Sequence, residues 1–347
     1  MGTPMDNQTD RYIRQRRLPE IGDAGQDKLA QARVLIVGCG ALGSVQAELM
    51  ARAGVGQIRI VDRDVADIGN LHRQFLLDED DVTARLPKAQ AAARRLRRIN
   101  SQISVEAIVQ DVRPGNVEDL VKDVDLVLDG TDNFETRYVL NDACVKHARP
   151  WVYGGVIGTT GQVFPIRPGG PCLRCLFPEP PDPGSVPTCD RAGVLNTASA
   201  TIAALQATWA VKLLTGADGL GDTNASPLQV VDPWHGESRT IVRTRNPNCP
   251  CCARRQFQFL AETRTSWCSV LCGRNTVQVT PASPVALDLH RLAAELKALG
   301  QVTANPFLIE FAFGGYELTI FADGRVLVAG TTDAAKARDL VSRFIGV

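Results

Sequence analysis

The sequence has 347 residues, 44% of them hydrophobic, and its 38 basic and 38 acidic side chains give a formal net charge of zero. This length exceeds one average domain, so we expect a main domain with a smaller one appended. The balanced charge argues against nucleic acid as the principal partner. The first residues are polar, and no apolar run reaches the roughly 18 residues of a membrane span, so we expect a cytoplasmic protein with no membrane segment.

The segment before the first strand is polar. Order is expected to begin near Arg11, and a polar helix to reach about Ala32. Arg11 and Arg14 lie three residues apart, which on spacing alone indicates a solvated face.

A strand, a turn, a helix and a second strand organise the chain from Val34 to Asp64. Val34–Val37 is apolar and mostly β-branched, which suits a strand buried on both faces. The turn that follows fits G-x-G-x-x-G with Gly38, Gly40 and Gly43. Such glycines allow a tight turn, a close backbone approach to phosphate and close packing of the next helix, expected over 41–53. The N-terminus of that helix can face an anion.

The second strand, Gln57–Val61, ends at Asp62, which lies 19 residues after Gly43. A carboxylate at this distance is placed to bind a ribose hydroxyl, and it strengthens a glycine signature that alone is moderately specific. Asp64 follows, and then a loop with the polar cluster Asn70-Leu71-His72-Arg73-Gln74. A loop beyond the carboxyl end of a strand lies where open α/β sheets bind ligands, although a hydrogen-bonded surface turn explains the cluster equally well.

Lys88 stands in the first turn of a helix that reaches about Ile99. The helix dipole disfavours a cation there, so Lys88 is a mild candidate for contact with an anionic ligand. Two more strands are expected over 103–109 and 124–128, with a short helix around 117–121 between them. This alternation predicts an α/β fold with a doubly wound, mainly parallel, Rossmann-like sheet.

Asp129-Gly130-Thr131-Asp132-Asn133 directly follows the strand at 124–128. Carboxylates at the end of such a strand suit a magnesium ion that carries nucleotide phosphates, because magnesium takes few protein oxygens. Asp132 or Asn133 could instead cap the helix expected over 134–147. Two acids are present, so both functions can be served.

Two strands, at 151–156 and 161–166, precede two Cys-x-x-Cys pairs. In a reducing compartment, metal binding accounts for paired cysteines better than disulfides do. Four thiolates would surround a tetrahedral zinc with no open position, so this site would be structural. Separate buried thiols are the alternative, and Cys251 is a spare. The pairs are Cys172 with Cys175 and Cys249 with Cys252.

Five prolines within 177–194 exclude a helix or central strand and predict an exposed, mobile loop. Cys189 lies in this loop and is either a nucleophile or an incidental thiol. A buried helix is expected over 196–214, and an antiparallel pair of strands over 228–231 and 239–244 closes the sheet.

We expect residues 1–268 to form the main domain and 269–347 a small α+β domain with the order βαβββα. Its predicted elements carry no catalytic motif, and turns at Gly314-Gly315 and Asp323-Gly324 join its last three strands. These elements are a strand at 276–279, a helix at 287–299, strands at 307–313, 316–321 and 325–329, and a helix at 333–345.

Taken in order, seven motifs resemble the ThiF/MoeB/HesA family, which is related to the ubiquitin-activating enzymes. They are Arg-Tyr-x-Arg-Gln from Arg11, the glycine turn, Asp-x-Asp, Asn-Leu-x-Arg-Gln, Pro-Lys, Thr-Asp-Asn and the cysteine pairs, and the match ends near Arg254. One departure is Ala41, where many members have glycine. The resemblance implies an adenylyltransferase that uses ATP, Mg²⁺ and structural Zn²⁺. It would activate the C-terminal glycine of a ubiquitin-like sulfur carrier of the MoaD or ThiS type, which ends in Gly-Gly, for molybdopterin or thiamin biosynthesis.

The resemblance also assigns roles to single residues. Arg14 would reach across a homodimer into the partner's ATP site, which replaces the interpretation as a solvated face. Cys189 matches the loop cysteine of the family and would attack the acyl-adenylate directly or as a persulfide, unless an external persulfide donor does so. The candidate nucleotide and magnesium residues are Gly38, Gly40, Gly43, Asp62, Asp64, Asn70, Arg73, Gln74, Lys88, Asp132 and Asn133, with magnesium on Asp132.

Two other classes share parts of this pattern. An NAD-dependent dehydrogenase would use the glycine turn but not the Asn70–Gln74 cluster, Asp132 or the cysteine pairs. A non-catalytic zinc scaffold would leave the phosphate-facing cations idle. Within the family, an enzyme that adenylates a tRNA base or a peptide is the nearer alternative, and the balanced charge counts mildly against tRNA.

Overall fold

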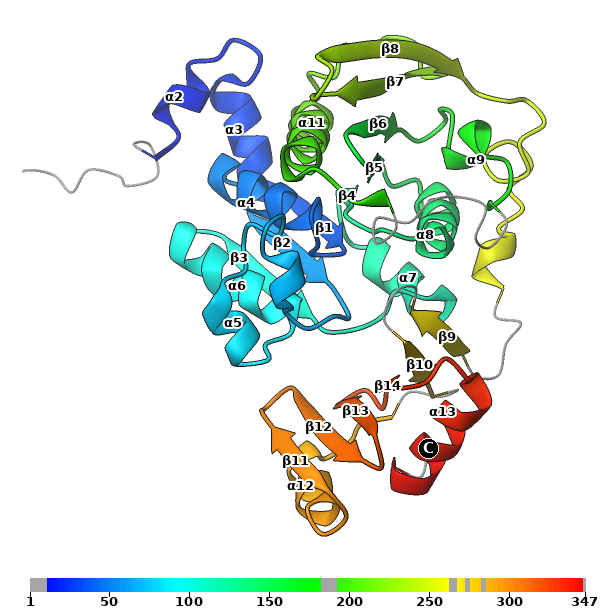
Figure 1. Cartoon of the computed structure of the whole chain (residues 1–347). Coiled ribbons are helices and arrows are strands. Elements are labelled where there is room, and N and C mark those ends of the chain that lie inside the picture. Colours follow the sequence, from blue (N-terminus) through cyan, green and yellow to red (C-terminus); the bar gives the residue numbers. More distant parts are fainter. Residues whose placement is uncertain (1–10, 182–191, 262–266, 272–274, 282–284, 346–347) are drawn as a thin grey trace, which may run out of the picture. The chain divides into compact units, whose positions relative to one another are not determined.

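The computed structural model describes residues 11–181, 192–261, 267–271, 275–281 and 285–345 (Figure 1). The chain divides into two compact units, residues 1–262 and 263–347, and each unit has a sheet of its own.

The first unit is built on an eight-stranded sheet with the order β3-β2-β1-β4-β5-β6-β7-β8. The first five strands in this order pair in parallel and the last three are antiparallel, so the predicted doubly wound, mainly parallel sheet is confirmed. The strands are β1 (Arg33–Val37), β2 (Gln57–Val61), β3 (Ser104–Ile108), β4 (Leu126–Asp129), β5 (Trp151–Ile157), β6 (Thr160–Ile166), β7 (Ala225–Asp232) and β8 (Glu237–Thr244).

Helices cover both faces of this sheet because the side chains of β1 point alternately to one face and the other. Val34 and Ile36 belong to the apolar core that includes residues of α3 (Gly22–Gln31), α4 (Gly43–Ala53), α6 (Lys88–Ile99) and α11 (Asn196–Thr215). Leu35 and Val37 belong to the core that includes residues of α7 (Pro114–Val121) and α8 (Phe134–Lys146). The apolar run predicted to be buried on both faces is therefore the centre of the unit.

The strand order reverses between β1 and β4, which are neighbours although two strands separate them in sequence. In open α/β sheets, ligands bind outside the carboxyl ends of the strands at such a switch point. Gly38 follows β1 and Gly130 follows β4 at this edge, and Asp62 follows β2.

Several short elements differ from the prediction. The N-terminal helix is two helices, α2 (Ile13–Arg16) and α3, and Pro19 lies between them, where it disfavours helix at the residue before it. Helix α4 begins at Gly43 and not at Ala41. Short helical elements also lie within the predicted loops. They are η1 (Ile68–Asn70), α5 (Glu79–Thr83), α9 (Leu173–Leu176) and η2 (Gln258–Leu260).

The second unit is an antiparallel sheet with the order β11-β12-β13-β14-β10-β9. Its helices, α12 (Leu289–Leu296) and α13 (Ala334–Ile345), share an apolar core with the sheet. Two strands were not predicted: β9 (Trp267–Leu271), which begins before residue 269, and β11 (Gln301–Ala304), which has four residues, one half-buried and three exposed. The others are β10 (Thr276–Thr280), β12 (Leu308–Phe313), β13 (Tyr316–Phe321) and β14 (Val326–Ala329).

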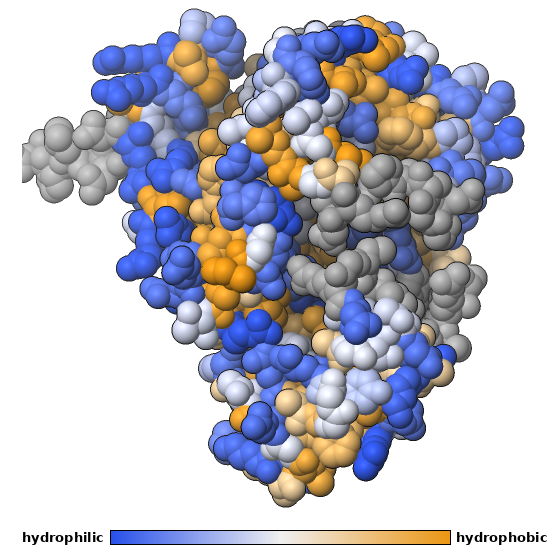
Figure 2. Space-filling view, viewed as in Figure 1, coloured by the Kyte–Doolittle hydropathy of each residue, from blue (hydrophilic) through white to orange (hydrophobic). Residues whose placement is uncertain are grey.

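Hydrophilic residues are spread over the face seen in Figure 2, with hydrophobic residues in separate groups between them. Within the described ranges, every helix is too short or too polar to span a lipid bilayer.

Candidate active site

The glycine turn joins β1 to α4 and packs against the end of β4. Gly38 has φ +86°, and a Cβ on it would lie 2.6 Å from the carbonyl oxygen of Gly130. A Cβ on Gly43 would lie 1.8 Å from the carbonyl oxygen of Gly38. At Gly40, by contrast, the nearest atom to a Cβ would be Nε2 of Gln74 at 3.9 Å. Gly38 and Gly43 are therefore required by packing, whereas Gly40 borders open space.

Asp62 ties the glycine turn to β2. Its Oδ2 accepts a hydrogen bond from the backbone N–H of Cys39 at 2.6 Å, and its Oδ1 accepts from the N–H of Asp64 at 2.7 Å. Burial raises the pKa of Asp62, while the Lys88 cation and the N–H of Cys39 act in the opposite direction. Each carboxylate oxygen has a second lone pair, which can accept from a ligand hydroxyl.

Lys88 is a buried cation beside this turn. Its Nζ donates to Oδ2 of Asp64 at 3.1 Å, and its backbone N–H donates to the Asp64 carbonyl oxygen at 2.8 Å. Burial alone would lower the pKa of Lys88, but the carboxylates of Asp64, Asp62 and Asp132 outweigh it and the pKa is raised. Lys88 is therefore charged at neutral pH.

The Asn70–Gln74 cluster forms a compact hydrogen-bonded turn. Arg73 donates through Nη2 to Oδ1 of Asn70 at 2.6 Å and through Nη1 to the carbonyl oxygen of Gly69 at 3.2 Å. Gln74 is buried, and within the described ranges its Oε1 has no hydrogen-bond partner. Because a buried, unsatisfied polar atom is costly, Gln74 has capacity left for a ligand.

In the segment after β4, one residue caps a helix and its neighbour is left exposed. Asn133 caps α8, since its Oδ1 accepts from the backbone N–H of Thr136 at 2.8 Å. Asp132 is exposed, and its charge contributes to raising the pKa values of Arg63, Lys88 and Arg137. Asp132 thus shares the switch point with the residues that follow β2.

A buried ion pair holds this segment in place. Arg137 of α8 donates through Nε to Oδ2 of Asp129 at 3.0 Å, and through Nη2 to the carbonyl oxygens of Thr131 and Gly154 at 2.6 and 3.0 Å. Burial alone would lower the pKa of Arg137, but Asp129 outweighs it. We did not single out Arg137 from the sequence. The one available signal was an arginine eight residues after a carboxylate that ends a buried strand.

The N-terminal arm is anchored by the neighbours of Arg14. The Tyr12 hydroxyl accepts from Nδ2 of Asn100 at 2.7 Å, and Nε2 of Gln15 donates to the Ala53 carbonyl oxygen at 2.9 Å. Arg14 itself is exposed, and within the described ranges it has no hydrogen bond or ion pair. The Arg14 side chain therefore lies in solvent.

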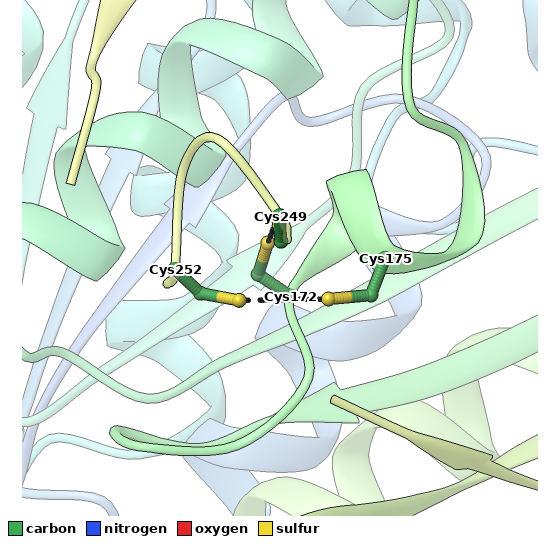
Figure 3. Close-up of side chains that lie close together, drawn as sticks. All are labelled: Cys172, Cys175, Cys249 and Cys252. Atoms are coloured by element: carbon green, nitrogen blue, oxygen red, sulfur yellow. Dashed lines mark hydrogen bonds between the residues drawn. The ribbon is translucent and has the colours of Figure 1, made fainter. Parts of the chain in front are cut away.

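The four paired cysteines come together (Figure 3). The sulfurs of Cys172 and Cys249 are 3.6 Å apart, those of Cys175 and Cys252 are 3.5 Å apart, and all four lie within 4.8 Å of one another. A tetrahedral zinc with bonds of about 2.3 Å needs sulfurs about 3.8 Å apart, so the cluster fits this ion. Cys251 is outside the cluster and accepts from Nδ2 of Asn141 at 3.3 Å. Cys189 lies outside the described residues.

A model of the ThiF family matches residues 12–251. The chain belongs to the ThiF family. The resemblance inferred from the seven motifs is therefore confirmed, and the matched residues span the glycine turn, the switch point and three of the four clustered cysteines.

Curated relatives in the ThiF family are similar over most of the chain. The Sulfur carrier protein ThiS adenylyltransferase of Bacillus subtilis is 43% identical over 344 residues, 97% of this chain and 100% of the relative. The Sulfur carrier protein adenylyltransferase of Thermus thermophilus is 41% identical over 249 residues, 70% of this chain and 90% of the relative. Among solved structures, E. coli MccB with ATP has a TM-score of 0.61 and 25% identity over 70% of this chain and 74% of that one.

One tight glycine and one open glycine of the ThiF-family turn allow a matched test. Gly43→Ala should lower the free energy of unfolding by roughly 1–3 kcal/mol, because its Cβ would meet the backbone at Gly38. Gly40→Ala should change stability much less and instead weaken nucleotide binding, because its Cβ would enter the open space beside Gln74. Urea denaturation and ATP titration separate the two effects. Equal destabilisation by both substitutions would contradict this assignment.

Proposed function

We propose that this chain adenylates the C-terminal glycine of a ubiquitin-like sulfur carrier protein that ends in Gly-Gly. The observation that supports the proposal is the set of groups at the switch point. Gly40 leaves open space beside Gln74, and the buried Lys88 cation is near enough to the exposed carboxylate of Asp132 for that charge to help raise its pKa. The similarity over 97% of the chain to a relative named for adenylating ThiS supports the same reaction.

In this proposal the glycine turn and the start of α4 bind the phosphates of ATP, because the positive end of the helix dipole favours an anion there. Asp62 binds the ribose hydroxyls, and Asn70, Gln74 and Asp64 line the same side. Lys88 and Arg73 supply positive charge to the phosphates. Asp132 would hold Mg²⁺, which neutralises phosphate charge when it is bound, and Asn133 places Asp132 by capping α8.

The chemical step needs alignment more than proton transfer. A terminal carboxylate with a pKa near about 3.5 is ionised at neutral pH, so no general base is required. One carboxylate oxygen attacks the α-phosphorus of ATP, the bond from that phosphorus to the bridging oxygen breaks, and pyrophosphate leaves with the electron pair. The product is an acyl-adenylate. Lys88 and Arg73 stabilise the charge that develops on the phosphates.

ATP–pyrophosphate exchange tests this function. Exchange should require a ThiS- or MoaD-type carrier and should disappear when the last glycine of the carrier is removed. Asp132→Ala should lower the exchange rate by roughly 10²–10³, a magnitude typical for loss of one electrostatic contributor. The control Asp119→Ala removes an exposed carboxylate that forms a surface ion pair with Lys122, and should leave exchange unchanged. Robust exchange without carrier would contradict the proposal.

The cysteine cluster is proposed to hold a structural Zn²⁺. Metal analysis of the purified protein should find about one zinc per chain, since four thiolates complete the coordination of one ion. Cys172→Ser should lose the metal and lower the melting temperature. Cys251→Ser should keep the metal, because Cys251 is not one of the four sulfurs that lie within 4.8 Å of one another, and its sulfur accepts from Asn141. Zinc retention in Cys172→Ser would refute the assignment.

We also propose a homodimer in which Arg14 completes the partner's ATP site. The anchored arm supports this, as do exposed apolar side chains that a second copy would cover: Ile13 and Leu18 on the arm, and Ile68 and Phe75 beside the nucleotide loop. The role of Cys189 as a nucleophile, and the alternative of an external persulfide donor, remain predictions from the sequence.

Subunit mixing tests the shared site. Arg14→Ala and Asp132→Ala homodimers should both be inactive. Random exchange between them gives mixed dimers with one intact site, so about a quarter of wild-type activity should return. Fluorescence energy transfer between labelled subunits confirms that exchange has occurred. Exchange without recovered activity would show that Arg14 does not act in the partner's site.

A further inference from the structure

The residue between Asp62 and Asp64 bridges the carboxyl ends of two strands. Nη1 of Arg63, directly after β2, lies 3.1 Å from each carboxylate oxygen of Asp111, which follows β3. Only 26% of the Arg63 side chain is exposed, and 24% of that of Asp111. This ion pair is therefore packed against the sheet edge and is not a surface contact.

The Arg63 guanidinium leans toward the switch point. Its Nε is 3.9 Å from Oδ1 of Asp64, whose other oxygen accepts from Lys88. Burial alone would lower the pKa of Arg63, but Asp111, Asp64 and Asp132 raise it.

The other half of the pair is held by the start of α7. Nδ2 of Asn116 donates to the Asp111 carbonyl oxygen at 2.8 Å, and Oδ1 of Asn116 accepts from the N–H of Arg113 at 2.9 Å. Asp111 is thereby fixed in position. A guanidinium that is bound to a fixed carboxylate keeps one orientation, whereas the guanidinium of an unpaired surface arginine rotates between several.

The order of the strands indicates which part of a nucleotide meets this plane. Under the proposed function, the glycine turn after β1 binds the phosphates and Asp62 after β2 binds the ribose. The next strand in the sheet is β3, so the base, which lies beyond the ribose, extends toward the space between the ends of β2 and β3. We infer that Arg63, held by Asp111, stacks its guanidinium on the adenine ring of ATP. A planar, weakly hydrated guanidinium suits such stacking, and a lysine ammonium does not.

Calorimetric titrations with ATP and with inorganic tripolyphosphate test this inference, which rests on the proposed nucleotide site. Arg63→Lys keeps the charge and removes the plane, so its Kd for ATP should rise roughly 5- to 20-fold, while its Kd for tripolyphosphate stays within about twofold of wild type. The control Arg59→Lys alters an arginine within β2 that pairs with Glu106 and Asp123, and should leave both values unchanged. In the exchange assay, Arg63→Lys should raise KM for ATP with little change in kcat.

Other outcomes decide against the inference. An unchanged Kd for ATP in Arg63→Lys would overturn it, and an equal loss of ATP and tripolyphosphate affinity would assign Arg63 to the phosphates. Asp111→Asn, which keeps Arg63 but loosens it, should raise the Kd for ATP by a smaller factor, and it decides the question if Arg63→Lys fails to fold. These titrations need no carrier, so missing carrier-dependent exchange in the wild type would refute the proposed reaction without affecting them.

Discussion

The site depends on a backbone contact that only glycine permits. Gly38 after β1, Gly130 after β4 and Gly43 at the start of α4 meet at one point, and a Cβ on any of them would lie between 1.8 and 2.6 Å from a backbone oxygen. The absence of three side chains lets the two central strands and the helix converge. As a result, the N-terminus of α4 lies at the switch point, where the positive end of the helix dipole favours an anion.

A buried hydrogen-bond network around Asp129, the residue before Gly130, supports this contact. The carbonyl oxygen of Asp129 accepts from Nε2 of Gln46 and Nε2 of Gln206, and its carboxylate binds Arg137 and Thr131. These groups are buried, so the network is stable only if its members satisfy one another. Its consequence for function is that the segment ending at Asp132 has a defined path, although Asp132 itself is exposed.

The parts of this site that could be predicted are those encoded by local spacing. The glycine turn, the acid 19 residues after it and the paired cysteines each lie within short windows, and the alternation of strands and helices implies the switch point. Gln46 and Gln206 could not be predicted, because their contact joins residues 160 apart and neither stands in a motif. The strand β9 was missed because its residues, Trp267–Leu271, show no apolar alternation, and β11 was missed because its four residues are too few for their alternation to stand out. For Arg14, the spacing predicted a solvated residue, and the structure has Arg14 exposed. A functional role for Arg14 was suggested only by the family pattern.

The charges around the crevice favour one nucleotide chemistry over another. Lys88 is paired with Asp64, and the carboxylates of Asp62 and Asp132 lie near it, so the free site is not simply a basic pocket. Two unit charges 4 Å apart interact by about 4 kcal/mol at an effective dielectric constant near 20, so these acids would oppose a bare polyphosphate. The pyrophosphate of NAD brings no cation to offset Asp132. A triphosphate accompanied by a divalent cation does, and under the proposed function the exposed carboxylate would then change from a repulsive group into a ligand. The charge of Asp132 near Lys88 is therefore a reason to prefer ATP over a dinucleotide, independent of the family pattern.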